Sequence, residues 1–132
     1  MKRLLSISGL VLITSLLTSC TRSNDDTNTI NNAATAGKWK VSLYFDEKDE
    51  TSDFAGYNFT FNTNGTATAE KSGSSVAGTW STTGSKFVVD FSADDVLDEL
   101  SNDWLIVEKT NTSIKLKDDN TTKNERLEFV KQ

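Results

Sequence analysis

Cys20 carries the side chain best suited to covalent chemistry in this sequence, and it is the only cysteine among 132 residues. Its thiol can accept an acyl chain, ligate a metal or form a disulfide. Cys20 stands between a mostly apolar run, 4–17, and a polar, acidic stretch, 21–26. The chemistry open to the Cys20 thiol therefore depends on the function of these two flanking segments.

The flank before Cys20 has the layout of a secretory signal: Lys2 and Arg3, a mostly apolar run, then the small pair Thr18-Ser19. A run of this length spans about 21 Å as a helix, short of the roughly 30 Å hydrocarbon core of a membrane. We therefore predict that residues 1–19 are a removed signal peptide and not a transmembrane helix.

The sequence Leu17-Thr18-Ser19-Cys20 resembles the bacterial lipobox, in which the cysteine is lipidated and becomes the mature N-terminus. The resemblance implies two or three acyl chains on Cys20, which anchor a protein firmly, because one chain binds a membrane only marginally. It also implies that no thiol remains for disulfides, metal ligation or catalysis. The alternative is an ordinary cleaved signal with an incidental cysteine.

Residues 20–36 are predicted to be the lipidated cysteine and a flexible tether, because Ile30 is the only large apolar side chain after Cys20 in this segment. A tether of this length spans roughly 20 to 25 Å. The cluster 23–26, "SNDD", resembles the acidic signal that sends lipoproteins of Bacteroidota-type bacteria to the outer face of the outer membrane. A solvated linker would also be acidic. The expected location is the outer membrane, lipid-anchored and exposed at the cell surface.

Composition argues against an enzyme and against nucleic acid as a partner. The net charge is -5 and becomes -7 once Lys2 and Arg3 are removed, so the surface repels nucleic acid and anionic lipid. There is no histidine, and with Cys20 acylated no catalytic dyad or triad can be proposed. The acidic clusters fall in the linker, in loops or at a helix cap, which does not suit paired-carboxylate hydrolysis. We expect no catalytic residues and no cofactor.

One acidic cluster follows the first predicted strand: Asp46, Glu47, Asp49, Glu50 and Asp53. Carboxylates of this kind suit Ca²⁺, but the spacing lacks an ordered loop with a glycine turn, and Lys48 intrudes. A solvated loop is the favoured interpretation, and no metal site is predicted.

From Gly37 onward the apolar residues recur with period two, which predicts half-buried strands. In 38–45 this pattern puts Trp39, Val41, Leu43 and Phe45 on one face. Seven more short segments are predicted strands: 57–62, 66–71, 76–82, 86–91, 103–109, 113–118 and 125–131.

The segment 92–102 differs, because Val96, Leu97 and Leu100 form a helical stripe behind a capping box of Ser92 and Asp95. It predicts a short helix between the fifth and sixth strands. Tight turns such as Asn64-Gly65 alternate with longer connections along the chain. In an up-and-down meander, alternate connections lie at opposite ends, so we expect one tight end and one end with long loops.

Gly37-Lys38-Trp39 resembles the G-x-W motif that opens the first strand of lipocalins, and the pattern of 37–132 resembles the small lipocalin-like lipoproteins of Bacteroidota. The resemblance implies an all-β fold, an eight-stranded up-and-down barrel. The chain departs from typical lipocalins in its shorter strands, its inserted helix and the lack of a helix after the last strand.

The same resemblance implies a barrel interior that holds one small apolar ligand. The aromatic residues expected near its mouth or deeper within it are Phe45, Tyr57, Phe59, Phe91 and Trp104, with Phe54 as a lid. These side chains are also what would fill a small core. Trp104 lies in "WLIV", apolar on both faces, so the pattern leaves its direction open.

Lipocalins commonly lay an arginine across the tryptophan of the G-x-W motif at the barrel floor. Arg126 is at the wrong end of its strand for this role, and Lys131 is predicted to cover Trp39 instead. Gly37, Trp39 and Lys131 are thus expected to be structural.

Two function classes remain open. The first is a lipid-anchored carrier or sensor of a small apolar ligand, and the second is a filled barrel whose loops bind an envelope protein or polymer. A cavity above about 300 Å³ favours the first, since small-molecule pockets are generally that large. A filled interior favours the second.

Overall fold

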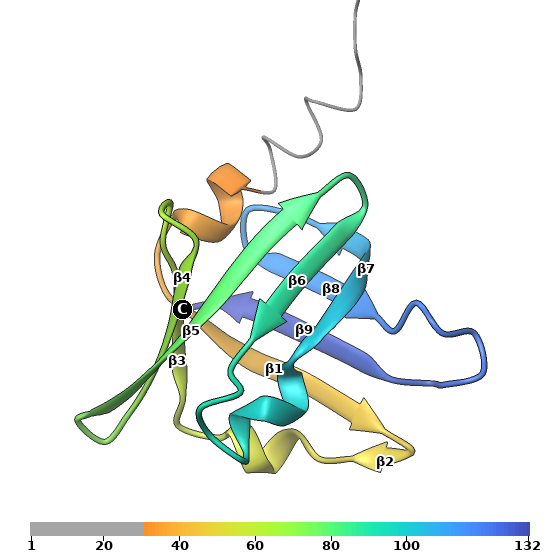
Figure 1. The fold of residues 1–132 in the computed structure, drawn as a ribbon, viewed down its shortest axis with the longest axis horizontal. Coiled ribbons are helices and arrows are strands. Elements are labelled where there is room, and N and C mark those ends of the chain that lie inside the picture. The colour runs from red at the N-terminus through yellow and green to blue at the C-terminus, as the bar shows by residue number, and fades with distance from the viewer. Residues whose placement is uncertain (1–30) are drawn as a thin grey trace, which may run out of the picture.

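The computed structural model describes residues 31–132, which form a closed antiparallel barrel (Figure 1). Each strand pairs with the next along the chain, and β1 also pairs with β9, which closes the barrel. The eight barrel strands are β1 (Trp39–Asp46), β3 (Asn58–Phe61), β4 (Thr66–Lys71), β5 (Ser74–Thr83), β6 (Lys86–Asp90), β7 (Asn102–Lys109), β8 (Ser113–Lys117) and β9 (Arg126–Lys131). The predicted all-β, up-and-down barrel is confirmed.

The first long connection contains two short elements that the sequence did not indicate. β2 (Lys48–Asp49) folds back on the end of β1, and the 3-10 helix η1 (Thr51–Phe54) follows it. Phe54 is buried, and its ring meets that of Tyr44 edge-on at 5.1 Å. Phe54 therefore fixes the connection to the barrel and is part of the core.

The helix predicted over 92–102 is only a four-residue 3-10 helix, η2 (Leu97–Leu100). Asp94 takes the capping role expected of Ser92: its carboxylate accepts the backbone N–H groups of Val96 and Leu97, both at 3.0 Å. Leu97 and Leu100 are buried against the barrel, whereas Val96 is exposed. The apolar stripe is thus satisfied by a single turn, which is too short for an α-helix.

Among the described residues, the α-helical ones lie elsewhere, at 31–35, just before β1. Ala33 and Ala34 are buried, and the Trp39 indole N–H donates to the carbonyl of Ala34 at 2.9 Å. The last residues of the segment predicted as a tether therefore pack against the barrel. The rest of that segment, Cys20 and the predicted signal peptide lie outside the described residues. Within 31–132, no helix is long and apolar enough to cross a membrane.

A β-bulge changes which side chains of β1 face the core. The pairing of β1 with β9 shifts between Val41 and Leu43, so that Tyr44, opposite Leu127, becomes the buried residue. Phe45, opposite Arg126, then faces outward and is half-buried. The prediction that Phe45 shares the inward face of Trp39 is wrong, because a bulge inserts one residue and inverts the alternation after it.

The barrel interior is an aromatic core. Phe129 of β9 meets Phe59 and Phe61 of β3 edge-on, with ring centroids 5.4 and 5.5 Å apart, and Phe61 meets Phe87 of β6 at 5.4 Å. All four side chains are buried, and the described residues contain no buried polar or charged residue. Rings at these separations gain attraction beyond their burial. Strands that do not pair with each other therefore touch through the barrel interior.

The two ends of the barrel differ as expected from the connections. The turns 62–65, 84–85 and 110–112 are short and lie at the same end of the barrel as the 31–35 helix (Figure 1). The longer connections, 47–57, 91–101 and 118–125, lie away from that helix. We call these the tight-turn end and the long-loop end.

Gly78 of β5 provides a direct test of the packing. A Cβ at this position would lie 2.2 Å from the Asp90 carbonyl oxygen and 2.6 Å from the Phe91 ring. We expect Gly78→Ala to lower the free energy of unfolding by about 1 to 3 kcal/mol, as overpacking does. Urea denaturation measures this loss.

The matched control is Gly84→Asn in the β5–β6 turn, where nothing lies within 4 Å and asparagine tolerates the positive φ of 59°. The free energy of unfolding of this variant should be close to that of the parent. Equal stability of Gly78→Ala and the parent would contradict the tight contact between β5 and Phe91.

Candidate functional site

The predicted ligand-lining residues inside the barrel are core residues. Phe59, Phe91 and Trp104 are each fully buried. Phe59 contacts the Phe91 ring at 5.8 Å, and the Trp104 indole donates to the carbonyl of Leu100 at 2.9 Å. Trp104 thus faces inward. The space in which an apolar ligand was expected is occupied by these side chains.

The two remaining residues of the predicted set lie at the barrel surface. Tyr57, just before β3, is half-buried, and its ring centroid is 6.1 Å from that of Phe59. The Lys71 ammonium lies 4.8 Å from the centroid of the Tyr57 ring. Phe45 is stacked on the outer wall under Arg126, whose guanidinium is 5.3 Å from the ring centre. The structure therefore brings Phe59 and Phe91 together, but it does not bring Phe45 to them.

The contact predicted at the barrel floor is present. The Lys131 ammonium lies 5.3 Å from the ring centre of Trp39. The two residues are directly opposite each other in the pairing of β1 with β9. Gly37 has a φ of 98°, and a Cβ there would lie 3.6 Å from the Lys131 side chain. The positive φ allows the chain to turn from the 31–35 helix into β1. These three residues close one end of the barrel.

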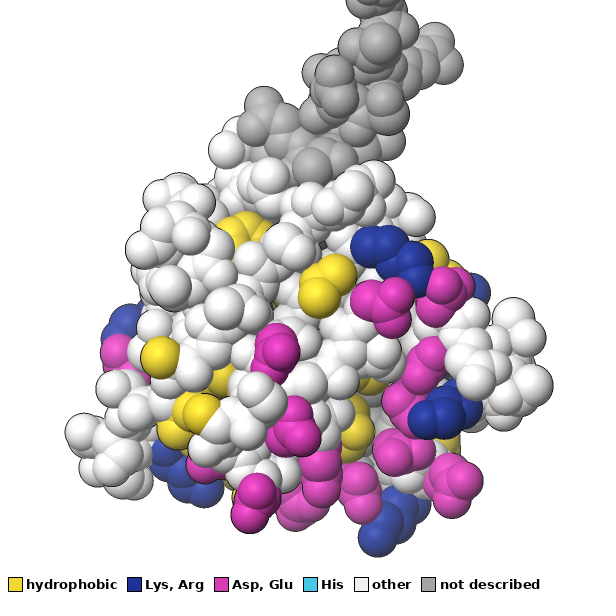
Figure 2. Space-filling model, in the orientation of Figure 1, with side chains coloured by type: hydrophobic (Ala, Val, Ile, Leu, Met, Phe, Trp, Pro, Cys, Tyr) yellow, Lys and Arg dark blue, Asp and Glu magenta, His cyan; other side chains and the backbone are white. Residues whose placement is uncertain are grey.

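The long-loop end carries most of the acidic charge (Figure 2). The segments 46–57, 90–101 and 118–125 contain thirteen acidic residues and two lysines. By contrast, the turns 62–65, 84–85 and 110–112 contain no charged residue. The distribution makes the long-loop end strongly negative.

Three carboxylates meet at this end from two different connections. Oxygens of Glu50, Asp53 and Glu99 lie within 4.8 Å of one another, and the Lys48 ammonium is 3.1 Å from Glu50. Burial raises the pKa of Glu99, and the charges of Glu50 and Asp53 raise it further. The sequence placed Glu50 and Asp53 in one loop, but their proximity to Glu99 depends on how η2 packs beside η1.

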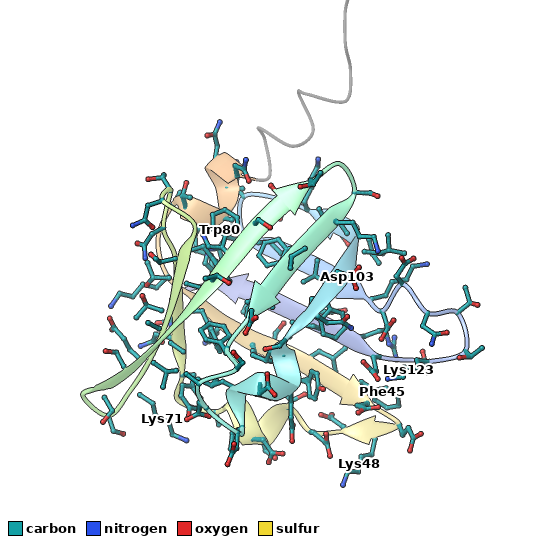
Figure 3. All side chains as sticks on the ribbon, viewed as in Figure 1. Phe45, Lys48, Lys71, Trp80, Asp103 and Lys123 are labelled. Carbon is teal, nitrogen blue, oxygen red and sulfur yellow. The ribbon has the colours of Figure 1, made fainter. Side chains whose placement is uncertain are left out.

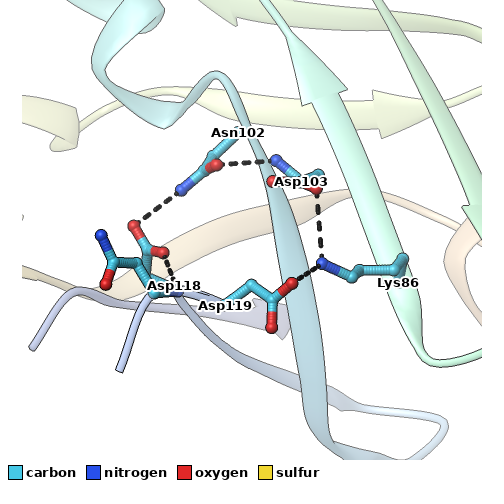
Figure 4. A network of polar contacts seen from close by, with 6 residues as sticks. Lys86, Asn102, Asp103, Asp118 and Asp119 are labelled. Carbon is cyan, nitrogen blue, oxygen red and sulfur yellow. Dashed lines mark hydrogen bonds and ion pairs between the residues drawn. The ribbon is translucent and has the colours of Figure 1, made fainter. Parts of the chain in front are cut away.

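A polar network ties the β8–β9 connection to β6 and β7 (Figure 4). Lys86 forms ion pairs with Asp103, at 3.3 Å, and with Asp119. Asn102 donates to Asp118 at 3.2 Å. Although burial opposes charge on Asp118, hydrogen bonds from the Asn120 backbone and the Asn102 amide lower the pKa of this carboxyl. The network holds the start of the β8–β9 connection against the barrel wall.

Clefts lined by described residues open at the surface of the barrel. One, of about 420 Å³, lies between the β1–β2 turn and the β8–β9 connection and is lined by Asp46, Glu47, Thr122, Lys123, Asn124 and Glu125. Figure 3 labels Lys123, one of these lining residues. A second cleft, of about 480 Å³, lies at the tight-turn end. These two clefts are thus at the outer surface of the barrel and not in its interior.

Comparison with known proteins finds no matching family model and no matching curated protein. Among solved structures, the chain is similar to a DUF4847 family protein from Bacteroides vulgatus ATCC 8482, known from a crystal structure. The TM-score is 0.60, the identity is 14%, and the match covers 78% of this chain and 97% of that protein. At this identity the similarity shows the fold alone, a small antiparallel β-barrel.

Removing the Lys131 ammonium tests the floor contact. We expect Lys131→Met, which keeps the apolar stem, to lower the free energy of unfolding by about 0.5 to 1 kcal/mol and to change the fluorescence of Trp39. Lys117→Met, at an exposed position of β8, is the control. If both variants give the parent's stability and emission spectrum, the ammonium has no role over Trp39.

The three-carboxylate group predicts a pH effect. Because the pKa of Glu99 is raised in the folded state, folding favours the protonated form of this carboxyl. Its contribution to stability is therefore fully present below the unfolded-state pKa and is lost as the pH rises through the folded-state pKa. Glu99→Gln should therefore increase stability at neutral pH, by less than about 1 kcal/mol because the group is exposed.

Thermal unfolding across acidic to neutral pH measures this effect. Asp95→Asn, at the same end but outside the three-carboxylate group, is the matched control. A neutral-pH melting temperature of Glu99→Gln at or below that of the parent would show that the repulsion does not act on stability.

Proposed function

We propose that this protein is a lipid-anchored lipoprotein of the outer membrane whose filled barrel binds an envelope protein through its long-loop end. The observation that carries the proposal is the burial of Phe59, Phe91 and Trp104 in contact with other core side chains. Because these side chains occupy the interior, recognition falls to the exterior and its loops. This favours the second of the two function classes over an apolar-ligand carrier.

The connectivity supports an outward orientation of that surface. The N-terminal segment joins the barrel at the tight-turn end, next to the 31–35 helix, and the long loops lie away from it (Figure 1). A lipid on Cys20 would therefore hold the tight-turn end toward the membrane. The long-loop end would face away from the lipid.

Charge indicates the chemistry of the partner. The excess of acidic residues in 46–57, 90–101 and 118–125 complements a basic protein surface. Complementary charge steers encounter and discriminates against acidic partners, and rim charges act more on association rate than on final affinity. Some carboxylates lie near η1 and η2, and others lie on the separate β8–β9 connection. A partner would therefore contact several segments at once.

The anchor is tested by Cys20→Ala in the source bacterium or a Gram-negative host. The parent should be recovered in the membrane fraction and the variant in the soluble fraction, because the thiol is the only acyl acceptor of its kind in the chain. Cys20→Ser, which also lacks the thiol, should behave like Cys20→Ala. Membrane retention of both variants at the parent's level would refute the lipid anchor.

The binding surface is tested by photo-crosslinking in intact cells. A crosslinking amino acid replaces Glu47, Asp95 or Asn120 at the long-loop end, or Lys115 on the barrel wall as control. We expect one discrete, basic envelope protein crosslinked from the long-loop positions and not from Lys115. Replacing Asp95 and Asp98, which do not cap η2, with lysine should abolish that crosslink.

Two results would contradict the proposal. One is a crosslink of equal yield from Lys115, and the other is saturable binding of a fluorescent fatty acid that quenches the buried tryptophans of the Cys20→Ala protein. The second result would restore the apolar-ligand carrier as the better account.

A further inference from the structure

A second cleft lies at the end of the barrel opposite the long loops. It measures about 480 Å³ and opens between the 31–35 helix, the β3–β4 turn and β5. Its lining residues are Asn31, Asn32, Thr35, Thr63, Asn64, Gly65, Trp80, Ser81 and Thr82. Segments distant in sequence thus build one surface hollow.

The lining is polar but carries no charge. Every polar side chain in it is an amide, a hydroxyl or the indole of Trp80, although a quarter of the residues of the whole chain are charged. The cleft beside the β8–β9 connection, by contrast, is lined by three acids and a lysine. A neutral, hydrogen-bonding surface disfavours ions, which would lose hydration without gaining a counter-charge, and suits a neutral ligand rich in hydroxyl groups.

Several of these groups are free to bind. Within the described residues, the side chains of Asn32, Thr63 and Ser81 have no hydrogen-bond partner. Asn31 and Asn64 use only their amide oxygens, to accept from Thr82 and Thr66, which leaves their N–H groups available. The cleft therefore offers both donors and acceptors, as a polyol requires.

The cleft is also held in shape before any ligand binds. The Thr82 hydroxyl donates to the Asn31 amide and so joins the helix to β5. Asn64 accepts from the backbone N–H and the hydroxyl of Thr66, at 3.0 and 2.7 Å, which fixes the β3–β4 turn. A preorganised site loses less conformational entropy on binding.

Trp80 forms the floor. Its indole N–H donates to the carbonyl of Asn62 at 2.7 Å, and its ring packs against Phe61 and Phe87 at 5.4 and 5.7 Å. Trp80 is 7% exposed and is one of the residues that line the cleft, while most of the residue is buried in the core. A fixed aromatic surface beside neutral hydrogen-bonding groups matches the C–H patches and hydroxyls of a sugar ring.

We propose that this cleft is a binding site for a neutral saccharide of one or two pyranose units. Its volume lies in the range of small-molecule sites, roughly 300 to 1,000 Å³. The saccharide could be free or belong to the head group of a membrane glycolipid, since both present the same hydroxyls. The site is separate from the long-loop end and does not depend on the proposed function.

The test is an NMR titration of the ¹⁵N-labelled Cys20→Ala protein with methyl glucoside, methyl galactoside, methyl mannoside, lactose and cellobiose, with tryptophan fluorescence alongside. We expect saturable shifts of the amide signals of Asn32, Thr63, Asn64 and Ser81 with at least one of these sugars. Glucuronate, which is charged, should bind more weakly than glucose derivatives.

Variants locate the site. Thr63→Val and Asn32→Ala should each weaken binding about 2- to 10-fold, which is the effect of one lost hydrogen bond, while circular dichroism remains that of the parent. Asn124→Ala, in the charged cleft at the other end, should bind like the parent. Phosphatidylcholine vesicles with and without lactosylceramide then distinguish a glycolipid head group from a free sugar.

Two outcomes would overturn the proposal. One is the absence of saturable shifts with all five sugars and with the lactosylceramide vesicles. The other is binding that Thr63→Val and Asn32→Ala leave unchanged, because it would place the saccharide elsewhere on the molecule.

Discussion

The contact of Phe129 with Phe59 and Phe61 in the middle of the barrel is the interaction on which the rest of the structure depends. β9 and β3 both pair with β1, and their rings meet on the interior side of β1. β1, which closes the barrel by pairing with β9, is therefore covered by aromatic rings on its inner face. Short strands enclose little volume, and large rings in contact with one another occupy it. Because the described residues contain no buried polar or charged residue, the interior supplies stability, and the charged side chains lie at the surface.

That division of roles explains the difference between the two ends. The turns 62–65, 84–85 and 110–112 of the tight-turn end contain no charged residue, and this end is joined to the 31–35 helix through Trp39 and Thr82. The long-loop end holds η1 and η2, whose buried Phe54, Leu97 and Leu100 attach charged loops to the aromatic core. Anionic groups such as Glu50 and Glu99 are thus held near each other by apolar packing a few residues away. Hydrophobic anchoring positions the charges in spite of their repulsion.

The strand pattern of the barrel could be predicted because period-two alternation reports one buried face directly, and all eight barrel strands lie where that alternation placed them. The alternation fails at the bulge before Tyr44, where hydrogen-bond register and not side-chain type sets the direction, and the register of β7 with β8 also shifts, between Ile106 and Glu108. Phe45 and Tyr44 are both aromatic, so the sequence alone could not show which of them faces inward. The same limit applies to η2, since a stripe of three apolar residues fits either a 3-10 turn or an α-helix.

The candidate sites were harder to predict than the strands. The cation over Trp39 could be predicted, because Lys131 lies on the same face of its strand as Leu127 and Phe129. The neutral cleft could not, since Asn31, Asn64 and Ser81 come from three elements and each looks like ordinary turn or edge chemistry in the sequence. Three of the aromatic residues predicted to line a ligand site do face the interior: Phe59, Phe91 and Trp104. Alternation cannot distinguish a side chain that lines a cavity from one that fills it.

The central claim, that the barrel is filled, is tested most directly by NMR under xenon pressure, because xenon enters dry apolar cavities. The account predicts no saturable shift at Phe59, Phe91 or Trp104 in the Cys20→Ala protein. Ile114→Ala, which opens a cavity in the same core, serves as the positive control. Saturable xenon shifts at these three residues in the parent interior would show an internal cavity and contradict the account.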